Sequence, residues 1–200
     1  YAERGETNRL LGRYNEALAD LNRAVEAQPD SGWTLGTRGQ VYQKLSRYGE
    51  ALADFDKALE HDPTANWIVG ERAKTYRQMG RYQDALAGFT QAIQTDPKTP
   101  WPVSERGETY RQMGRYDEAL ADLNKAIELN PQDAFALGTR GSVYRGLKRQ
   151  NEAIADLTRA IELDPQYAFA LSERGEPYRQ AQQLEKALVD FDLSLRLEPD

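Results

Sequence analysis

RGETYRQMGRYDEALADLNKAIELNP, residues Arg106–Pro131, is the stretch that decides the fold, because it recurs along the whole chain without insertions. The spacing is 34 residues, the separation of Pro97 from Pro131. The small residue after the arginine recurs as Gly5, Gly39, Ala73, Gly107, Gly141 and Gly175, and the closing proline as Pro29, Pro63, Pro97, Pro131, Pro165 and Pro199. A fixed period of this size predicts stacked supersecondary units instead of one globular core.

The pattern of each repeat predicts two helices joined by a short turn. In the unit that begins at Pro100, apolar and small residues recur at helical spacing up to Gly114, and a glycine there is a typical helix stop. A second amphipathic pattern follows and ends at Pro131, at Tyr116, Ala119, Leu120, Leu123, Ala126 and Ile127. One hairpin cannot bury both sides of its second helix. We therefore expect an all-α, right-handed solenoid of stacked antiparallel helical hairpins, with a concave and a convex face.

The period divides the chain into six repeats of one array, 1–200. Repeat one is truncated and repeat six is degenerate, and the boundaries are 1–31, 32–65, 66–99, 100–133, 134–167 and 168–200. Pro177 falls inside the first helix of repeat six, where a proline removes one backbone hydrogen bond and crowds the preceding turn. That helix is therefore expected to start late, bend or shift locally.

The pattern resembles the tetratricopeptide repeat (TPR) family. A small residue precedes Tyr110, Gly–Arg–Tyr follows at 114–116, and Glu–Ala–Leu, Ala–Ile and a proline come after it in fixed phase. The resemblance implies a TPR superhelix whose first helices line the concave groove. It also implies a groove that binds peptides or partner proteins.

Composition excludes several other classes. The net charge of −6 disfavours a nucleic acid or an anionic membrane as the main partner. No run approaches the ~20 apolar residues of a membrane span. Without cysteine there is no thiolate chemistry and no zinc–sulfur site, and His61 is the only histidine. We expect no enzyme activity, no cofactor and no metal, in a cytoplasmic protein that is one part of a longer chain.

Arginines precede the small residue in every repeat, and an aspartate column lies on the second helices. The ladder arginines are Arg4, Arg38, Arg72, Arg106, Arg140 and Arg174, and the aspartates are Asp20, Asp54, Asp122, Asp156 and Asp190, with Gly88 as the exception. Partly buried charges are normally paired, so an interhelical ladder is favoured over ligand contact. Pairing within a repeat would leave Arg72 without a partner, because Gly88 replaces the aspartate, whereas pairing with the preceding repeat would leave Arg106 without one.

Two further columns are candidates for binding a partner. The aromatic column, in the first turn of the first helices, consists of Trp33, Trp67, Trp101, Phe135 and Phe169. These rings are either hydrophobic anchors for a ligand or braces between repeats. The groove arginines are Arg77, Arg111, Arg145 and Arg179, together with Arg9, and Glu108 stands three residues before Arg111. They either pair with acidic segments of a partner or form a solvated face neutralised by their own glutamates.

The last helix carries apolar residues with no repeat after them, Leu188, Phe191, Leu193, Leu195 and Leu197. Terminal repeats normally need a polar outer face. Either another helix continues the protein or two copies meet here.

These features favour a scaffold that binds a protein or peptide, such as an acidic segment, in the groove as the recognition module of a larger intracellular protein. The alternative is self-association through the uncapped ends. Single-stranded RNA along the aromatic and arginine columns is a remote alternative, against which the acidic balance argues.

Overall fold

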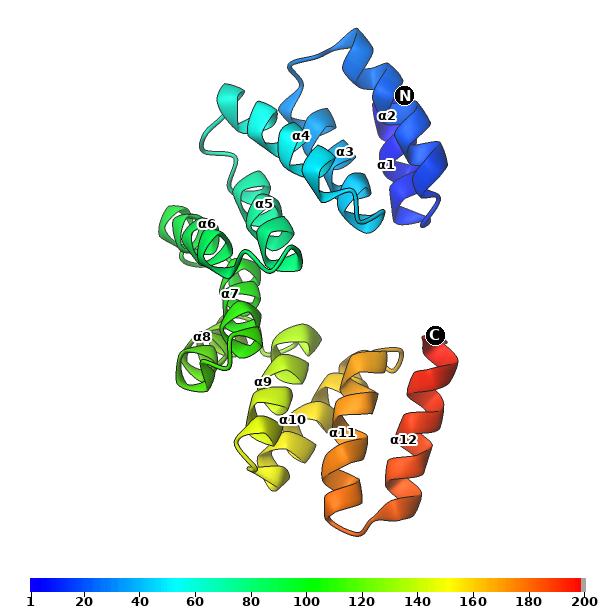
Figure 1. Ribbon diagram of the computed structural model, residues 1–200, viewed down its shortest axis with the longest axis vertical. Helices are drawn as coiled ribbons and strands as arrows, with labels where there is room; N and C mark the ends of the chain where they lie inside the picture. Colours follow the sequence, from blue (N-terminus) through cyan, green and yellow to red (C-terminus); the bar gives the residue numbers. More distant parts are fainter. Residues whose placement is uncertain (199–200) are drawn as a thin grey trace. The chain divides into compact units, whose positions relative to one another are not determined.

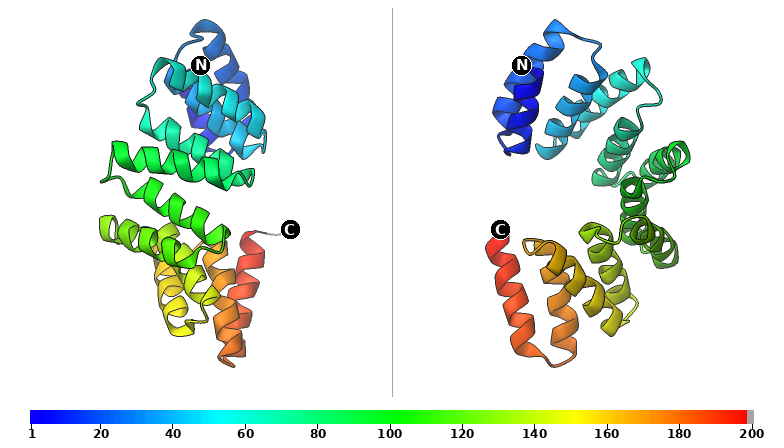
Figure 2. Two further views of the ribbon diagram at one scale, coloured as in Figure 1. Left: turned by 60° about the vertical axis from the view of Figure 1, so that its left-hand side comes forward. Right: turned by 180° about the vertical axis from the view of Figure 1, so that it is seen from behind.

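A computed structural model describes residues 1–198 as helices joined by short loops, and none of these residues forms a strand (Figure 1). The chain divides into two compact units, the first over Tyr1–Pro97 and the second beginning at Lys98. The predicted all-α stack of antiparallel hairpins is confirmed, and within each unit the two further views show the same hairpins (Figure 2). A single array over the full length stays a prediction.

Each unit contains three hairpins. The helices of the first unit are α1 (Ala2–Leu10), α2 (Tyr14–Ala27), α3 (Gly32–Lys44), α4 (Tyr48–His61), α5 (Asn66–Gln78) and α6 (Tyr82–Thr95). Those of the second unit are α7 (Pro100–Gln112), α8 (Tyr116–Leu129), α9 (Ala134–Gly146), α10 (Gln150–Leu163), α11 (Ala168–Gln180) and α12 (Leu184–Leu197). In the second unit α7, α9 and α11 pack in succession, so the first helices of its repeats form one continuous face.

The turn inside every hairpin uses one residue with a positive φ. These residues are Gly12, Ser46, Gly80, Gly114, Lys148 and Gln182. At Gly114 the φ is 72°, and the following Arg115 N–H donates to the Tyr110 carbonyl at 2.9 Å. This backward bond satisfies a carbonyl that the end of the helix leaves without a partner.

The small residues let the two helices of a hairpin approach closely, as the sequence predicts. A Cβ on Gly107 would lie 2.8 Å from Cγ of Leu123, and a Cβ on Gly39 would lie 2.6 Å from the Phe55 ring. Leu123 and Phe55 are fully buried. In these hairpins a leucine or phenylalanine of the second helix therefore packs directly against the backbone of the first helix.

The interhelical ladder is present, and five of its arginines pair with the aspartate of their own repeat. Each pair is separated by 16 residues, and the five pairs are Arg4–Asp20, Arg38–Asp54, Arg106–Asp122, Arg140–Asp156 and Arg174–Asp190. The Nε of Arg38 and the Nε of Arg106 each donate to the carboxylate at 2.7 Å. In repeat three, where Gly88 supplies no carboxylate, Nη1 of Arg72 donates instead to Asp56 of repeat two at 2.8 Å.

Pro177 does not delay the helix that contains it, so the expectation of a late start is wrong. Helix α11 begins 34 residues after α9, at the equivalent position, and has the same length of 13 residues. Pro177 is buried inside this helix, and its own carbonyl still accepts from Ala181 N at 3.0 Å. Packing around the ring holds the helix together beyond the missing N–H.

Candidate functional site

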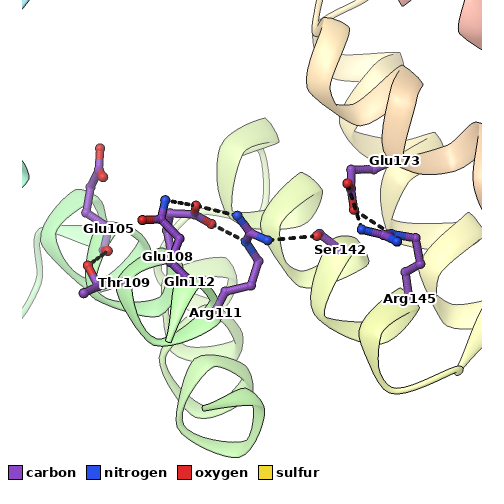
Figure 3. Close-up of polar contacts among 8 residues, drawn as sticks. All are labelled: Glu105, Glu108, Thr109, Arg111, Gln112, Ser142, Arg145 and Glu173. Atoms are coloured by element: carbon purple, nitrogen blue, oxygen red, sulfur yellow. Dashed lines mark hydrogen bonds and ion pairs between the residues drawn. The ribbon is translucent and has the colours of Figure 1, made fainter. Parts of the chain in front are cut away.

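The groove arginine Arg111 is held by its own helix. Its Nε and Nη2 donate to the two carboxylate oxygens of Glu108 at 2.7 and 2.8 Å, and Nη1 reaches Ser142 Oγ at 3.4 Å (Figure 3). Gln112 Nε2 adds a donor to Glu108 at 2.7 Å. The Glu108 carboxylate is buried and fully engaged, so the α7 end of this surface is fixed before any ligand arrives.

Arg145, at the same position one repeat later, faces the other way. Its Nε and Nη2 donate to Glu173 on α11, 28 residues ahead, at 2.8 and 3.0 Å (Figure 3). Arg111 has Thr139 at that spacing, where four of the six repeats have a glutamate, and pairs with Glu108 in its own helix instead. Arg9, with Thr37 ahead of it, likewise pairs with Glu6 in its own helix at 2.6 Å.

A cavity of about 260 Å³ lies beside these pairs in the second unit. Its lining consists of Glu108, Phe135, Thr139, Tyr167 and Phe169. The guanidinium of Arg111 lies over the Phe169 ring, 5.7 Å from its centroid. Four of the predicted site residues therefore come together: Glu108 and both phenylalanines in the lining, and Arg111 at the edge.

One member of the aromatic column, Trp67, packs against the preceding repeat. The Trp67 indole lies on Gly36 of the preceding first helix, where a Cβ would come within 2.2 Å of it. At the equivalent Gly138 the space is taken by the ring of Tyr167, not by Phe169. The Tyr167 and Phe169 rings are 5.7 Å apart, so Phe169 is left free to line the cavity.

The remaining predicted residues lie outside this cavity. Trp33 is 42% exposed on α3, whereas Trp101 is half-buried on α7. Arg77 is half-buried at the end of α5, in the first unit. Arg179 is exposed at the end of α11, where it pairs with Glu176 at 2.7 Å.

On α12 the predicted apolar residues divide into two groups. The Phe191 ring packs on Gly175, and Phe191, Leu193 and Leu197 are half-buried. Leu188 and Leu195 are exposed to 63% and 59%.

Two residues of the cavity are not among the predicted site residues, although each is unusual for its position in the repeat. Tyr167 stands where the other repeats have Ser31, Ala65, Thr99 and Asp133, so it is an aromatic residue at a position of small or polar ones. Thr139 belongs to the Leu–Gly–Thr–Arg–Gly variant that repeat five shares with repeat two, where other repeats have glutamate. Both of these unusual residues lie in repeat five, 134–167.

The electrostatic environment of the cavity is acidic. Burial is the main cause that raises the pKa of the Tyr167 phenol, followed by Glu108, Asp133 and Glu105, while Arg111 lowers it. Thr139 is 1% exposed, and its hydroxyl has no hydrogen-bond partner among residues 1–198. The described part of the chain contains no group of three or more His, Cys, Asp or Glu side chains that could hold a metal ion. None of its helices is long and apolar enough to cross a bilayer.

Comparison with known proteins defines the class. Models of the tetratricopeptide repeat match residues 1–64, 42–100, 104–133 and 136–167, and the chain belongs to this family. No curated protein is significantly similar in sequence. The TPR fold supports a general role as a protein-interaction scaffold.

Solved structures agree with this fold. A tetratricopeptide repeat protein from Parabacteroides merdae is 22% identical with a TM-score of 0.84, over 100% of this chain and 78% of that one. TTC0263, a TPR protein of Thermus thermophilus, is 25% identical with a TM-score of 0.75, over 85% and 93%. YrrB, described as a TPR protein with an unusual peptide-binding site, is 24% identical with a TM-score of 0.59, over 90% and 93%.

Proposed function

We propose that this chain is a recognition scaffold that holds a peptide or a segment of a partner protein against the face formed by α7, α9 and α11. The observation that carries the proposal is the cavity on this face, walled by Phe135, Tyr167 and Phe169. Aromatic side chains around a recess are typical of the few residues that dominate a binding interface. The description of YrrB as a peptide-binding TPR protein supports the same class of ligand.

The groove arginines do not favour an acidic segment as the ligand. Arg111 and Arg145 each donate two hydrogen bonds to a carboxylate of the chain itself, Glu108 and Glu173. An incoming carboxylate would have to displace one of these partners and leave it without its charge pair, which costs free energy. We therefore propose that apolar contact, and not the arginines, provides most of the affinity.

The experiment is a selection of random peptides displayed on phage against the full chain. Selected peptides are then titrated by calorimetry against the wild type and a variant with both Phe135→Ala and Phe169→Ala. We expect affinity to fall at least roughly tenfold, because two buried aromatic contacts are removed. A variant with Leu147→Ala, in the turn between α9 and α10, is the control. Unchanged affinity in the double variant, with its fold intact by circular dichroism, would refute binding on this face.

Self-association through α12 is a second candidate, and one observation favours it. Leu184, Leu188, Val189 and Leu195 on this helix are each more than half exposed, between 52% and 63%. A second copy of the chain could bury these side chains in an isologous contact. Sedimentation across a range of concentrations tests this candidate without reference to any peptide.

A further inference from the structure

The cavity of the second unit is smaller than a typical small-molecule site. Its volume of about 260 Å³ is below the ~300–1,000 Å³ typical of sites that enclose a whole small molecule. Phe135 comes from α9, Phe169 from α11, and Tyr167 from the residue directly before α11. Because three rings from two neighbouring elements converge, the recess suits an apolar side chain presented by an extended or helical segment.

Thr139 stands at a position where most repeats carry a carboxylate. At the position of Thr139, repeats four and six have Glu105 and Glu173, and Glu173 reaches back to Arg145 of the preceding repeat. Thr139 is shorter and cannot bridge in this way, and Arg111 is held by Glu108 instead. Since Thr139 lines the cavity, a longer side chain at this position would take up part of its space.

Thr139 also marks a specific point of contact. Thr139 lines the cavity and is 1% exposed, and its hydroxyl has no hydrogen-bond partner among the described residues. Buried hydroxyls are paired in the great majority of cases, since an unpaired one forfeits its bonds to water. A ligand whose backbone N–H or carbonyl reached this oxygen would restore the missing bond.

The charged groups around the cavity favour a ligand of one charge. Glu108 lines the cavity, Glu105 and Asp133 act on Tyr167 together with it, and Arg111 is the one cation of that set. From Lys98 onward the sequence has 14 Lys and Arg against 18 Asp and Glu, a net charge of −4. Electrostatic complementarity therefore favours a basic partner over an acidic one.

We infer that this cavity binds a peptide that inserts one apolar side chain between Phe135, Tyr167 and Phe169 and carries a basic residue next to it. The inference rests on the proposed function and specifies its ligand. The peptide backbone pairs with the Thr139 hydroxyl, and the flanking basic group faces the carboxylates around the recess.

The test uses the full chain and a blocked seven-residue peptide with leucine at its centre, lysine on both sides and glycine elsewhere. Binding is followed by two-dimensional NMR and calorimetry at low salt. We expect saturable binding, roughly tenfold weaker when the central leucine is alanine. Replacing both lysines by glutamate should weaken it further, and added salt should reduce that difference.

The decisive variant is Thr139→Glu, which installs the residue that repeats four and six carry at this position. It is expected to fold, to pair with Arg111 and to abolish binding of the lysine–leucine peptide. Thr37→Glu makes the same change at the equivalent position of the first unit and should leave binding unchanged. Thr139→Val keeps the side-chain shape without the hydroxyl and should weaken binding severalfold.

Equal affinity of the Thr139→Glu variant and the wild type would overturn the inference, as would stronger binding of the glutamate-flanked peptide. No binding of the lysine–leucine peptide to the wild type at millimolar concentration would overturn it too. Peptides selected from the random library that bind the Thr139→Glu variant normally would leave the proposed scaffold function standing. The two proposals therefore fail separately.

Discussion

Arg72 of repeat three donates a hydrogen bond to the carboxylate of Asp56 in repeat two at 2.8 Å, so its charged partner belongs to the preceding repeat. At the same position in repeats one and four, Asn22 and Asn124 are neutral and accept a secondary bond from Arg38 and Arg140. Gly88 has removed the carboxylate of repeat three, and Asp56 supplies one from the other side. The guanidinium keeps a charged partner although its direction is reversed.

The two ladder registers should differ in strength, and Asp54→Asn against Asp56→Asn tests this. Asp54 is 6% exposed and binds Arg38 through both carboxylate oxygens, whereas the side chain of Asp56 is 53% exposed with one bond. We expect Asp54→Asn to lower the free energy of unfolding by about 1.5–3 kcal/mol and Asp56→Asn by about 0–1 kcal/mol. Urea unfolding measures both, and equal losses would contradict the assignment.

Repeat three has Ala73 and Gly88 at the two positions where the other repeats have a glycine and an aspartate. A Cβ on Gly88 would lie 2.8 Å from the Cβ of Ala73, at the place where the other repeats have a glycine. Gly88→Asp should therefore clash and destabilise the first unit, despite restoring the aspartate column. Ala73→Gly alone should cost about 0.5–1 kcal/mol through helix propensity.

The double variant Ala73→Gly with Gly88→Asp rebuilds the Gly–Asp arrangement of the other repeats. We expect it to be more stable than the sum of the single changes by roughly 0.5–3 kcal/mol, because the clash is gone and Arg72 gains a partner in its own repeat. A double-mutant cycle in urea measures this coupling. Strict additivity of the two changes would show that Ala73 and Gly88 are independent.

The sequence was sufficient for the hairpins, because glycine, apolar spacing and proline repeat without a gap. It also predicted the ladder, but it left the register open between pairing within a repeat and pairing with the preceding repeat. It did not predict the cavity, because a cavity depends on which ring enters which space. Nothing in the pattern says that Tyr167, and not Phe169, covers Gly138. The start of α11 was predicted incorrectly because the packing around Pro177 is a tertiary effect.

Three of the hairpin turns hold a strained residue. Ser46, Lys148 and Gln182 have φ values of 58°, 60° and 59°, a region that disfavours side chains with a Cβ. Replacing each by glycine should stabilise its hairpin by about 1 kcal/mol, because the steric strain is relieved. Gly80→Ser makes the reverse change at an equivalent turn and should destabilise. Thermal melts compare the four variants, and a loss of stability in Lys148→Gly would refute the argument.

Acid should lower the stability of helix α11 through protonation of Glu176. Hydrogen bonds from Arg179, then from Gln180, lower the pKa of this carboxyl from 4.5 to about 2. Since the unfolded chain takes up the proton first as the pH falls, this stabilisation is complete above pH 4.5 and is lost between 4.5 and about 2.

Glu176→Gln removes the titrating group and should make the free energy of unfolding less dependent on pH in that window. Because the side chain of Glu176 is partly exposed, at 28%, the difference should shrink at high salt. Urea titrations at about pH 6 and about pH 3 compare the wild type with the variant. Parallel acid losses in both proteins would show that Glu176 contributes nothing measurable.

The apolar side of α12 leads to the last prediction. Leu188 and Leu195 are exposed to 63% and 59%, and exposed leucines of this size favour association when they gather on one helix. We expect the chain to associate reversibly at high concentration, and Leu188→Glu with Leu195→Glu to make it monomeric. Leu147→Glu alters a leucine that is 37% exposed on a distant turn, and should leave association unchanged. Sedimentation velocity over a wide concentration range measures the outcome, and a strictly monomeric wild type would exclude α12 as a self-association surface.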